Sequence, residues 1–433
     1  MKPLFIISSA FDTYSGYGAR SRDLIKAIIE TNKYTVRLLT QRWGNTPFGF
    51  CKDNPEWSYL YDLVLPNNQL PKQPEIWMQI TVPNEFQPVG KFNIGCTAGI
   101  ESTICPVEWT EGINRMDLTL TSSEHSKKVF VESKFEVRNR ETNALEKKVE
   151  LQKPIEVLFE GANLDIYKVI ESHQIKTINL DSIKEKFAYL FVGHWMQGDM
   201  GEDRKNVGLL IKAFYETFKN KTNAPALILK TSQVGSSYMD REEILKKIKK
   251  IKKTINSVNL PNIYLLHGDF TDEEMNELYN HSKVKAMISL TKGEGYGRPL
   301  LEFTLSKKPL IATAWSGHID FLNPEFTNLI GGKLEKVHPS TQNQFLIPES
   351  MWFSPEHGHI GFYLKDVFEN YKNYTDKAKR QAFRSKNEFS WDKMKEKVSE
   401  LLDKYIPEFP KEVKLSFPTV KKIELPKKET ING

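Results

Sequence analysis

The sequence predicts an α/β protein built from two doubly wound parallel sheets. Short apolar runs alternate with segments of helical periodicity along most of the chain, the pattern of strands joined by crossover helices. The alternation falls into two blocks, separated by a polar stretch over residues 165–185. The chain has 433 residues, which is more than one ordinary core needs. We therefore expect two principal domains.

In the first block, six short apolar runs are the expected strands, and they cover residues 4–7, 35–40, 75–81, 93–97, 117–121 and 154–159. Helices are expected over 19–29 and 126–131. The polar, alternating segment 134–152 predicts an inserted hairpin. We assign residues 1–170 to an N-terminal Rossmann-like domain that contains this hairpin.

In the second block, the expected strands cover residues 188–192, 226–229, 263–266, 285–290 and 309–313. Apolar residues recur at helical spacing from 207 to 218, and further helices are expected over 273–279 and from Pro299 onward. We assign 186–388 to a C-terminal Rossmann-like domain and 165–185 to a linker. A helix over 389–407 can cross back to the first domain, and the Pro- and Lys-containing residues 408–433 form a tail.

Composition narrows the protein class. The chain is 39% hydrophobic and 27% charged, as in ordinary soluble proteins, and no apolar run approaches the ~20 residues of a membrane-spanning helix. The first residues predict a strand rather than a signal peptide. Three cysteines without metal-type spacing fit a reducing, cytoplasmic compartment. A net charge of +6 permits an acidic partner without requiring one. Nothing in the sequence indicates the oligomeric state.

A glycine-rich segment, GEGYGRPLLE over residues 293–302, carries the strongest functional signal. It follows an apolar strand, and Pro299 suits the first position of a helix. Backbone N–H groups at such a turn can bind an anion. Glu302 lies about one turn into the helix, so its carboxylate can approach that of Glu294. This arrangement suits a nucleotide-diphosphate sugar, whose phosphates lie between two hydroxylated ends. The alternative is a surface turn with two solvated glutamates.

A second glycine segment, with Gly16 and Gly18, follows the first expected strand and opens a helix. A dehydrogenase fingerprint would place a third glycine where Ser21 stands and an acidic residue at the end of the second strand. That strand ends at Thr40 and Gln41 instead. The pattern therefore disfavours a nicotinamide cofactor and still allows the close approach of a diphosphate.

Three charged segments are further candidates. Arg204 and Lys205 precede a helix, where two cations oppose the helix dipole unless an anion such as a diphosphate offsets them. Glu101 follows a strand end, on the side where parallel sheets bind ligands. The alternatives are a solvated basic turn and a surface glutamate. The lysine-rich run 246–253 favours a solvated helix face over a nucleic-acid patch. No Asp-x-Asp motif in a suitable loop and no His/Cys cluster appears, so we predict neither a catalytic metal nor a cofactor besides the nucleotide sugar.

These segments resemble the retaining glycosyltransferases of the GT-B fold known as glycosyl transferases group 1. The resemblance covers about residues 1–405. The E-x7-E signature of that family is matched by Glu294 and Glu302. The other family patterns are a strand-to-glycine step, a basic pair followed by L-x-x-A-F, a second strand-to-glycine step and a late Phe-Ser-Trp, matched at 192–193, 204–214, 266–268 and 389–391.

The resemblance implies two domains that face a cleft, and it assigns roles to residues of this chain. Arg204 and Lys205 would neutralise the leaving diphosphate. Glu302 would hold the ribose hydroxyls. The remaining donor-site residues would contact the sugar or the diphosphate, and they are Glu294, Gly295, Tyr296, Gly297, Gly16, Gly18, Gly268 and His194. His194 stands where the family often has arginine, so the basic role of that arginine would pass to Arg204. Glu101 stands near the place of a family histidine close to the reacting carbon, so the resemblance implies a catalytic role for Glu101.

The same region also resembles glycosyltransferases carried by large DNA phages, several of which glycosylate hydroxymethylated bases. This implies a hexosyl transfer, with UDP-glucose as the preferred donor and 5-hydroxymethylcytosine or a related pyrimidine in phage DNA as the acceptor, in the host cytoplasm. Cations and aromatics in the N-terminal block fit such an acceptor, and they are Arg20, Arg22, Lys26, Arg42, Lys52, Trp43, Phe48, Phe50 and Trp57. Alternatively, the aromatics pack a long loop. The competing functions are transfer to a surface glycan or lipopolysaccharide, and sugar-nucleotide binding without activity.

Overall fold

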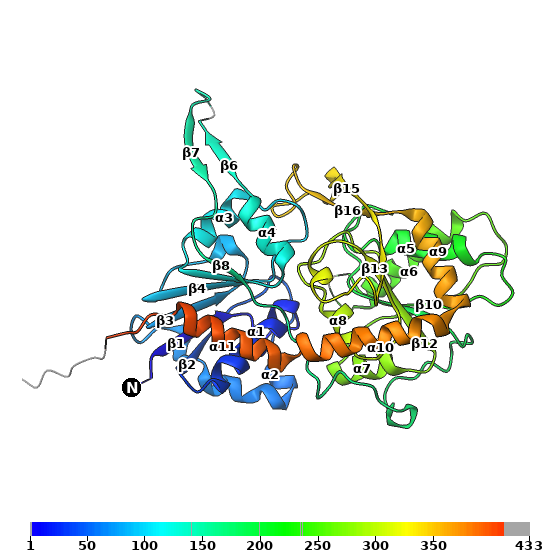
Figure 1. The fold of residues 1–433 in the computed structure, drawn as a ribbon, viewed down its shortest axis with the longest axis horizontal. Helices are drawn as coiled ribbons and strands as arrows, with labels where there is room; N and C mark the ends of the chain where they lie inside the picture. Colours follow the sequence, from blue (N-terminus) through cyan, green and yellow to red (C-terminus); the bar gives the residue numbers. More distant parts are fainter. Residues whose placement is uncertain (1, 140, 199, 234, 236, 411–433) are drawn as a thin grey trace, which may run out of the picture.

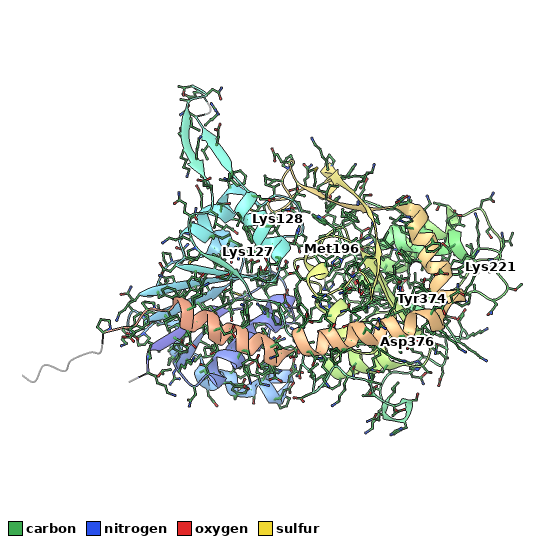
Figure 2. All side chains as sticks on the ribbon, in the orientation of Figure 1. Lys127, Lys128, Met196, Lys221, Tyr374 and Asp376 are labelled. Atoms are coloured by element: carbon green, nitrogen blue, oxygen red, sulfur yellow. The ribbon has the colours of Figure 1, made fainter. Side chains whose placement is uncertain are left out.

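The structure is a computed structural model that describes residues 2–139, 141–198, 200–233, 235 and 237–410. Two α/β domains lie side by side, each with one six-stranded sheet flanked by helices (Figure 1). Side chains fill the space between each sheet and its helices (Figure 2). The last stretch of the predicted tail, from residue 411, lies outside the described residues.

The N-terminal sheet is parallel, with strand order β2-β1-β3-β4-β5-β8. Its strands are β1 (Leu4–Ser9), β2 (Thr35–Thr40), β3 (Ile76–Ile80), β4 (Phe92–Thr97), β5 (Leu118–Thr121) and β8 (Ile155–Val157). The helices of this domain are α1 (Gly16–Glu30), α2 (Phe50–Asp53), α3 (Val107–Asn114) and α4 (Glu124–Glu132). The antiparallel pair β6 (Phe135–Arg138) and β7 (Leu145–Val149) projects from the domain as a hairpin (Figure 1).

The C-terminal sheet is also parallel, with order β11-β10-β9-β12-β13-β14. Its strands are β9 (Ala188–Val192), β10 (Ala226–Lys230), β11 (Ile263–Leu266), β12 (Val284–Ser289), β13 (Leu310–Thr313) and β14 (Asn328–Ile330). Its helices are α5 (Val207–Phe218), α6 (Tyr238–Lys253), α7 (Asp272–Asn280), α8 (Arg298–Thr304), α9 (His357–Glu369) and α10 (Tyr371–Glu388). In sheets of this order the ligand crevice lies where the strand order reverses, which here is between β9 and β12.

The final helix, α11 (Trp391–Tyr405), leaves the C-terminal domain and packs on α1 of the N-terminal domain (Figure 1). Met394, Val398 and Leu402 belong to the N-terminal core. Backbone hydrogen bonds between Ala162 and residues 389 and 391 hold the crossing point. The two domains are therefore joined twice by the chain.

The side chain of Arg20 on α1 is buried where α11 packs on the N-terminal domain. Its side chain is 2% exposed. The guanidinium donates to the carbonyl oxygens of Leu158 and Phe159 and contacts Met394 Sδ at 3.2 Å. One buried cation thus connects α1, the end of the N-terminal sheet and α11.

Replacing Arg20 by methionine is expected to lower the free energy of unfolding by about 3 kcal/mol, because two buried carbonyls lose a charged donor. Urea unfolding followed by circular dichroism measures this change. The exposed pair of Lys33 with Asp403 on α11, at 2.6 Å, supplies the control. Lys33→Met should cost less than about 1 kcal/mol. Equal effects of the two substitutions would contradict a structural role for Arg20.

The segment expected to be a linker instead packs along the C-terminal domain. Glu277 on α7 accepts hydrogen bonds from the backbone N–H groups of Thr177 and Ile178 at 2.8 and 3.0 Å. Leu180 and Ile183 are buried in the C-terminal core. The polar composition of residues 165–185 predicted a free linker. Composition alone does not reveal that a carboxylate on α7 accepts hydrogen bonds from the backbone of this segment.

Helix α1 begins earlier than expected. It starts at Gly16 rather than residue 19, because the Ser15 side chain caps it and accepts the Gly18 N–H at 2.9 Å. Gly16 and Gly18 consequently lie in the first helical turn.

An antiparallel pair that the sequence did not predict, β15 (Gly332–Lys336) and β16 (Met351–Pro355), follows β14. We call residues 332–355 the strap. It reaches from the C-terminal domain to the N-terminal domain (Figure 1), where Met351 and Thr103 exchange hydrogen bonds and the Phe345 ring lies 5.5 Å from that of Trp109. The strap therefore connects the domains on one side of their junction.

Two simpler findings concern the cysteines and the helices. All three cysteines are free and buried. Across the described ranges of the chain, none of the helices has both the length and the apolar character needed to cross a membrane.

Candidate active site

The residues predicted from separate segments meet between β9 and β12. The guanidinium of Arg204, in the loop before α5, donates to the Gly293 carbonyl oxygen at 2.7 Å and contacts a Glu294 carboxylate oxygen at 3.4 Å. The Lys205 ammonium contacts the other oxygen of Glu294 at 2.5 Å. The structure thus brings both cations onto the first carboxylate of the E-x7-E segment, at the edge where parallel sheets bind ligands.

The N-terminal domain contributes Glu101 to the same cluster. A Glu101 carboxylate oxygen lies 3.5 Å from a terminal nitrogen of Arg204. Glu101 is the more exposed partner, at 35% of its side chain against 16% for Arg204. Arg204 therefore bridges carboxylates of both domains, and Glu101 remains the partly exposed end of that bridge.

The ion pairs of the cluster favour the charged forms of its buried side chains, as their pKa shifts indicate. Burial acts to raise the pKa of Glu294, but Lys205 and Arg204 outweigh it and lower that pKa to about 2. Burial opposes charge on Arg204, whereas Glu101 and Glu294 raise its pKa. Burial lowers the pKa of Lys205, against the attraction of Glu294. Two partly buried cations held beside an ionised carboxylate can stabilise a developing negative charge.

The glycine loop between these groups touches the other domain. A β-carbon on Gly293 would lie 1.9 Å from the Glu101 carbonyl oxygen, and one on Gly295 would lie 2.3 Å from that of Ala98. The Ser122 hydroxyl also donates to the Gly295 carbonyl at 3.1 Å. Glycine is therefore required at both positions by the close approach of the facing backbone.

Glu302, the second carboxylate of the segment, lies elsewhere in the same loop-helix unit. It accepts a hydrogen bond from Arg298 at 2.8 Å, and Arg298 reaches across to Asp23 on α1 at 2.7 Å. Burial raises the pKa of Glu302, and Arg298 opposes this shift. The two glutamates therefore have different cationic partners, and the ribose-binding role of Glu302 stays a prediction.

The other predicted donor-site residues differ in how they are placed. Gly16 has open space around it, whereas a β-carbon on Gly18 would lie 2.3 Å from the Thr13 carbonyl oxygen. Exposed His194 follows β9 and pairs with Ser232 at 3.2 Å. Gly268 has a left-handed φ of 117°, and its carbonyl accepts a hydrogen bond from Lys230. The Tyr296 side chain is only 3% exposed, so it offers the site its backbone alone.

Sequence reasoning missed three supporting residues. Ser316 accepts the Glu294 N–H at 2.9 Å, and Arg298 and Asp23 complete the chain from Glu302 to α1. The spacing of Arg298 and Glu302, four residues apart on a helix, was a readable signal. No sequence pattern indicated Ser316 or Asp23, because the residues that they contact are distant in the sequence.

Several residues expected to meet a DNA acceptor have internal roles instead. Arg20 is buried as described, and Arg22 donates to the carbonyls of Phe11 and Thr13 while its guanidinium lies 3.4 Å from the centre of the Phe50 ring. Both predictions of a surface cation are wrong, because helix α1 turns these side chains into the domain.

Of the other cations and aromatic residues expected to meet DNA, some pack against other side chains and some are exposed. Phe50 and Trp57 pack against the N-terminal core. The Lys26 ammonium lies 4.8 Å from the centre of the Trp391 ring. Trp43 stacks on Tyr17 with ring centres 3.9 Å apart. Phe48 remains exposed at 51%, and Arg42 and Lys52 are also exposed.

Helix α6 contains the lysine-rich run. Its Ile244 and Ile251 are buried, so the lysines occupy the outer side, as predicted for a solvated face. Across the described residues, no three His, Cys, Asp or Glu side chains come together as a potential metal site.

Solved structures with the same architecture are glycosyltransferases of the GT-B fold. The chain superposes on a glycosyltransferase from Rickettsia africae with a TM-score of 0.60 and 12% identity, over 94% of this chain and 99% of that one. HepE of Anabaena, solved with UDP and glucose, gives 0.56 and 12% over 93% and 100%. Sucrose-phosphate synthase from Thermosynechococcus elongatus gives 0.57 and 11% over 93% and 99%.

No protein-family model and no curated protein matches the sequence. The structural similarities, together with the two six-stranded parallel sheets, establish the fold: this chain has the GT-B fold.

Proposed function

We propose that the protein is a retaining glycosyltransferase that moves a hexose, glucose in the first instance, from a UDP-sugar to a hydroxyl group. The observation that carries the proposal is the convergence of Arg204, Lys205 and Glu294 at the β9–β12 edge, with Glu101 opposite. HepE, which shares the fold, was solved with UDP and glucose and also with UDP-glucose.

In the proposed reaction, the bond between the sugar's anomeric carbon and the UDP oxygen breaks. A bond from the same face of that carbon to the acceptor oxygen forms, and the acceptor proton leaves with UDP. Lys205 and Arg204 stabilise the charge that develops on the diphosphate. Glu294 positions both cations and faces the sugar. Contact between the domains around the glycine loop excludes water from the reacting carbon.

The intact cluster also favours an enzyme over a protein that only binds sugar nucleotides. Each of the three charged side chains contacts another member, and all are largely buried. Release of UDP from UDP-glucose, measured with and without acceptor, tests this point directly. Tight UDP binding without any release would favour the binding protein.

For the acceptor, we propose 5-hydroxymethylcytosine or a related pyrimidine in DNA as the first substrate to test. Incubation with UDP-glucose and hydroxymethylated or plain DNA, followed by nucleoside mass spectrometry, should yield a glucosylated nucleoside from the modified DNA alone. DNA binding should weaken steeply with salt, because phosphate contacts release counterions. Exposed Arg42 and Lys52 are the cations that support this binding, and the double substitution to alanine should reduce the salt dependence.

A glycan acceptor is the second candidate, and one observation favours it. Arg20 and Arg22 are internal, so the basic surface for a polyanion is smaller than the sequence suggested. DNA left unmodified with every common sugar nucleotide, together with no salt-dependent DNA binding, would make a surface glycan or lipopolysaccharide the acceptor to pursue.

The reaction is expected to proceed in excess EDTA at the rate found without it. The reason lies in the sequence: Arg204 and Lys205 supply the positive charge for the diphosphate, and no Asp-x-Asp motif occupies a suitable loop. UDP release measured with EDTA and after adding back magnesium or manganese checks this expectation. Activity that disappears with EDTA and returns with either metal would contradict it.

A further inference from the structure

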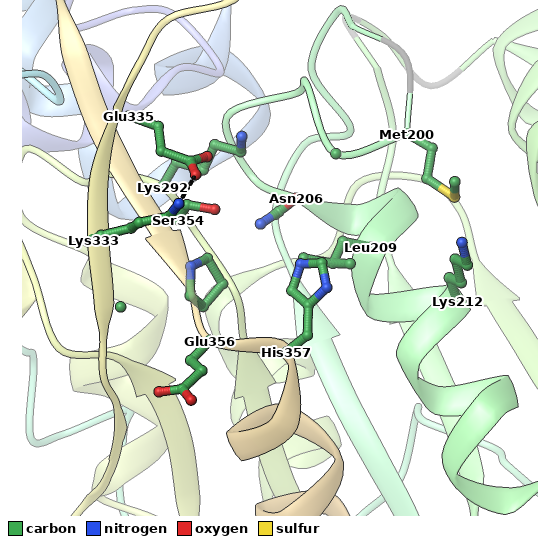
Figure 3. Close-up of a pocket in the computed structure, with 13 residues that line it drawn as sticks. Met200, Asn206, Leu209, Lys212, Lys292, Lys333, Glu335, Ser354, Glu356 and His357 are labelled. Carbon is green, nitrogen blue, oxygen red and sulfur yellow. Dashed lines mark ion pairs between the residues drawn. The ribbon is translucent and has the colours of Figure 1, made fainter.

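A cavity of about 690 Å³ lies behind the candidate active site. Every residue that lines it belongs to the C-terminal domain (Figure 3). Its walls are the start of α5, the start of α9 and the strap strands β15 and β16. The cavity is therefore separate from the junction between the two domains, where an acceptor must enter.

A buried amide without partners marks this cavity as a binding site. Asn206 is 1% exposed and lines the cavity, toward which its side chain points (Figure 3). Among the described residues, neither its amide nitrogen nor its amide oxygen has a hydrogen-bond partner. Unbonded buried amides are rare and unfavourable. A ligand with both a hydrogen-bond acceptor and a donor would satisfy this one.

The charge around the cavity favours an anion. The Lys333 ammonium is paired with Glu335 at 3.0 Å, and Glu356 is paired with His359 at 3.3 Å and points away from the cavity (Figure 3). Among the lining residues that the structure describes, Lys212 and Lys292 have no carboxylate within ion-pair distance, and Asp203, Glu335 and Glu202 act on Lys292 only from farther away. Helix α9 begins with His357, which lines the cavity, and runs for 13 residues, so the positive end of its dipole lies at this wall.

Lys292 is the more buried of these two cations, at 6% exposed, and it connects the cavity to the active site. Its ammonium lies 4.9 Å from the centre of the Trp352 ring. Its backbone N–H donates to the Arg204 carbonyl at 2.8 Å, and its carbonyl accepts the Phe353 N–H at 2.9 Å. One residue thus joins the loop of Arg204 to the strap.

We propose that this cavity binds a small phosphorylated polyol, distinct from the sugar nucleotide. The phosphate is held by Lys212, Lys292 and the start of α9, and a hydroxyl group bonds the Asn206 amide. The volume accommodates a ligand considerably larger than inorganic phosphate.

Calorimetric titration of the full chain tests the site, with glycerol 3-phosphate, inorganic phosphate and glycerol as the probes. Glycerol 3-phosphate should bind more tightly than phosphate, and glycerol should not bind. Asn206→Gly keeps the left-handed φ of 57° at that position while removing the amide, and it should raise the Kd for glycerol 3-phosphate about tenfold. Lys212→Ala should raise it by a similar factor.

Two further variants locate the bound probe. Lys221→Ala removes an exposed lysine at the outer end of the C-terminal domain (Figure 2) and should leave the Kd unchanged. Lys205→Ala, in the active-site cluster, should also leave it unchanged. Loss of binding in Lys205→Ala with normal binding in Asn206→Gly would place the probe in the active site and overturn the proposal. Absence of binding to the wild-type chain at millimolar probe would also overturn it.

Discussion

Replacing Lys205 by alanine is expected to lower kcat for transfer from UDP-glucose by about tenfold to a hundredfold. Loss of one charge-assisted contact to a phosphate costs about 1.5–3 kcal/mol, and each ~1.4 kcal/mol changes a rate tenfold. The Lys205 ammonium lies 2.5 Å from Glu294, and the lysine side chain is 16% exposed. Water therefore cannot freely take over its contact with the phosphate. UDP release under saturating donor measures the effect.

The matched control is Lys219→Ala, which removes a lysine paired with Glu216 at 2.6 Å on the surface. It should leave kcat unchanged. Kinetics of Lys205→Ala equal to the wild type would remove Lys205 from the reaction and with it the main support for the proposed function.

The same variant should change the acid limit of activity. Burial acts to raise the pKa of Glu294, and Lys205 and Arg204 lower it from an ordinary 4.5 to about 2. In the folded protein Glu294 therefore stays ionised until the pH falls toward 2. Without Lys205 the pKa rises, so activity in the variant should decline at a higher pH than in the wild type.

Replacing Gly295 by alanine is expected to reduce kcat by about tenfold or more while leaving the fold intact. Its new β-carbon would lie 2.3 Å from the Ala98 carbonyl oxygen, which belongs to the other domain. Overpacking of this kind costs about 1–3 kcal/mol. Moving the domains apart relieves it, and that movement also separates Glu101 from Arg204.

Two measurements separate loss of domain contact from loss of folding. The free energy of unfolding of Gly295→Ala should fall by no more than the about 1–3 kcal/mol of the overpacking, so the chain stays folded, and UDP should still bind because the cations remain in place. Gly331→Ala serves as the control, since nothing lies within 4 Å of its added carbon. Full activity in Gly295→Ala would show that this domain contact is not needed for turnover.

Much of the fold could be predicted because its signals are local. Every strand of the two sheets except the three-residue β14 (Asn328–Ile330) was predicted as a short apolar run, and most of these strands are largely buried. The predicted helices between them carry apolar residues at helical spacing. The 3.6-residue and two-residue periods follow from backbone geometry, so they can be read without knowing any long-range contact. The strap escaped prediction because its strands β15 and β16 are largely polar and depend on partners in both domains.

The sequence by itself determined the alternation that builds two parallel sheets and the strand-turn-helix segment with Glu294 and Glu302. It also determined the basic pair that precedes α5. The tertiary structure alone decided that Lys205 contacts Glu294 whereas Arg298 contacts Glu302, and that Arg204 bridges to Glu101 in the other domain. It also turned Arg20 and Arg22 inward. The physical reason is that a charge specifies only that some partner is needed, whereas the choice of partner depends on which distant segments the folded domains bring within about 4 Å.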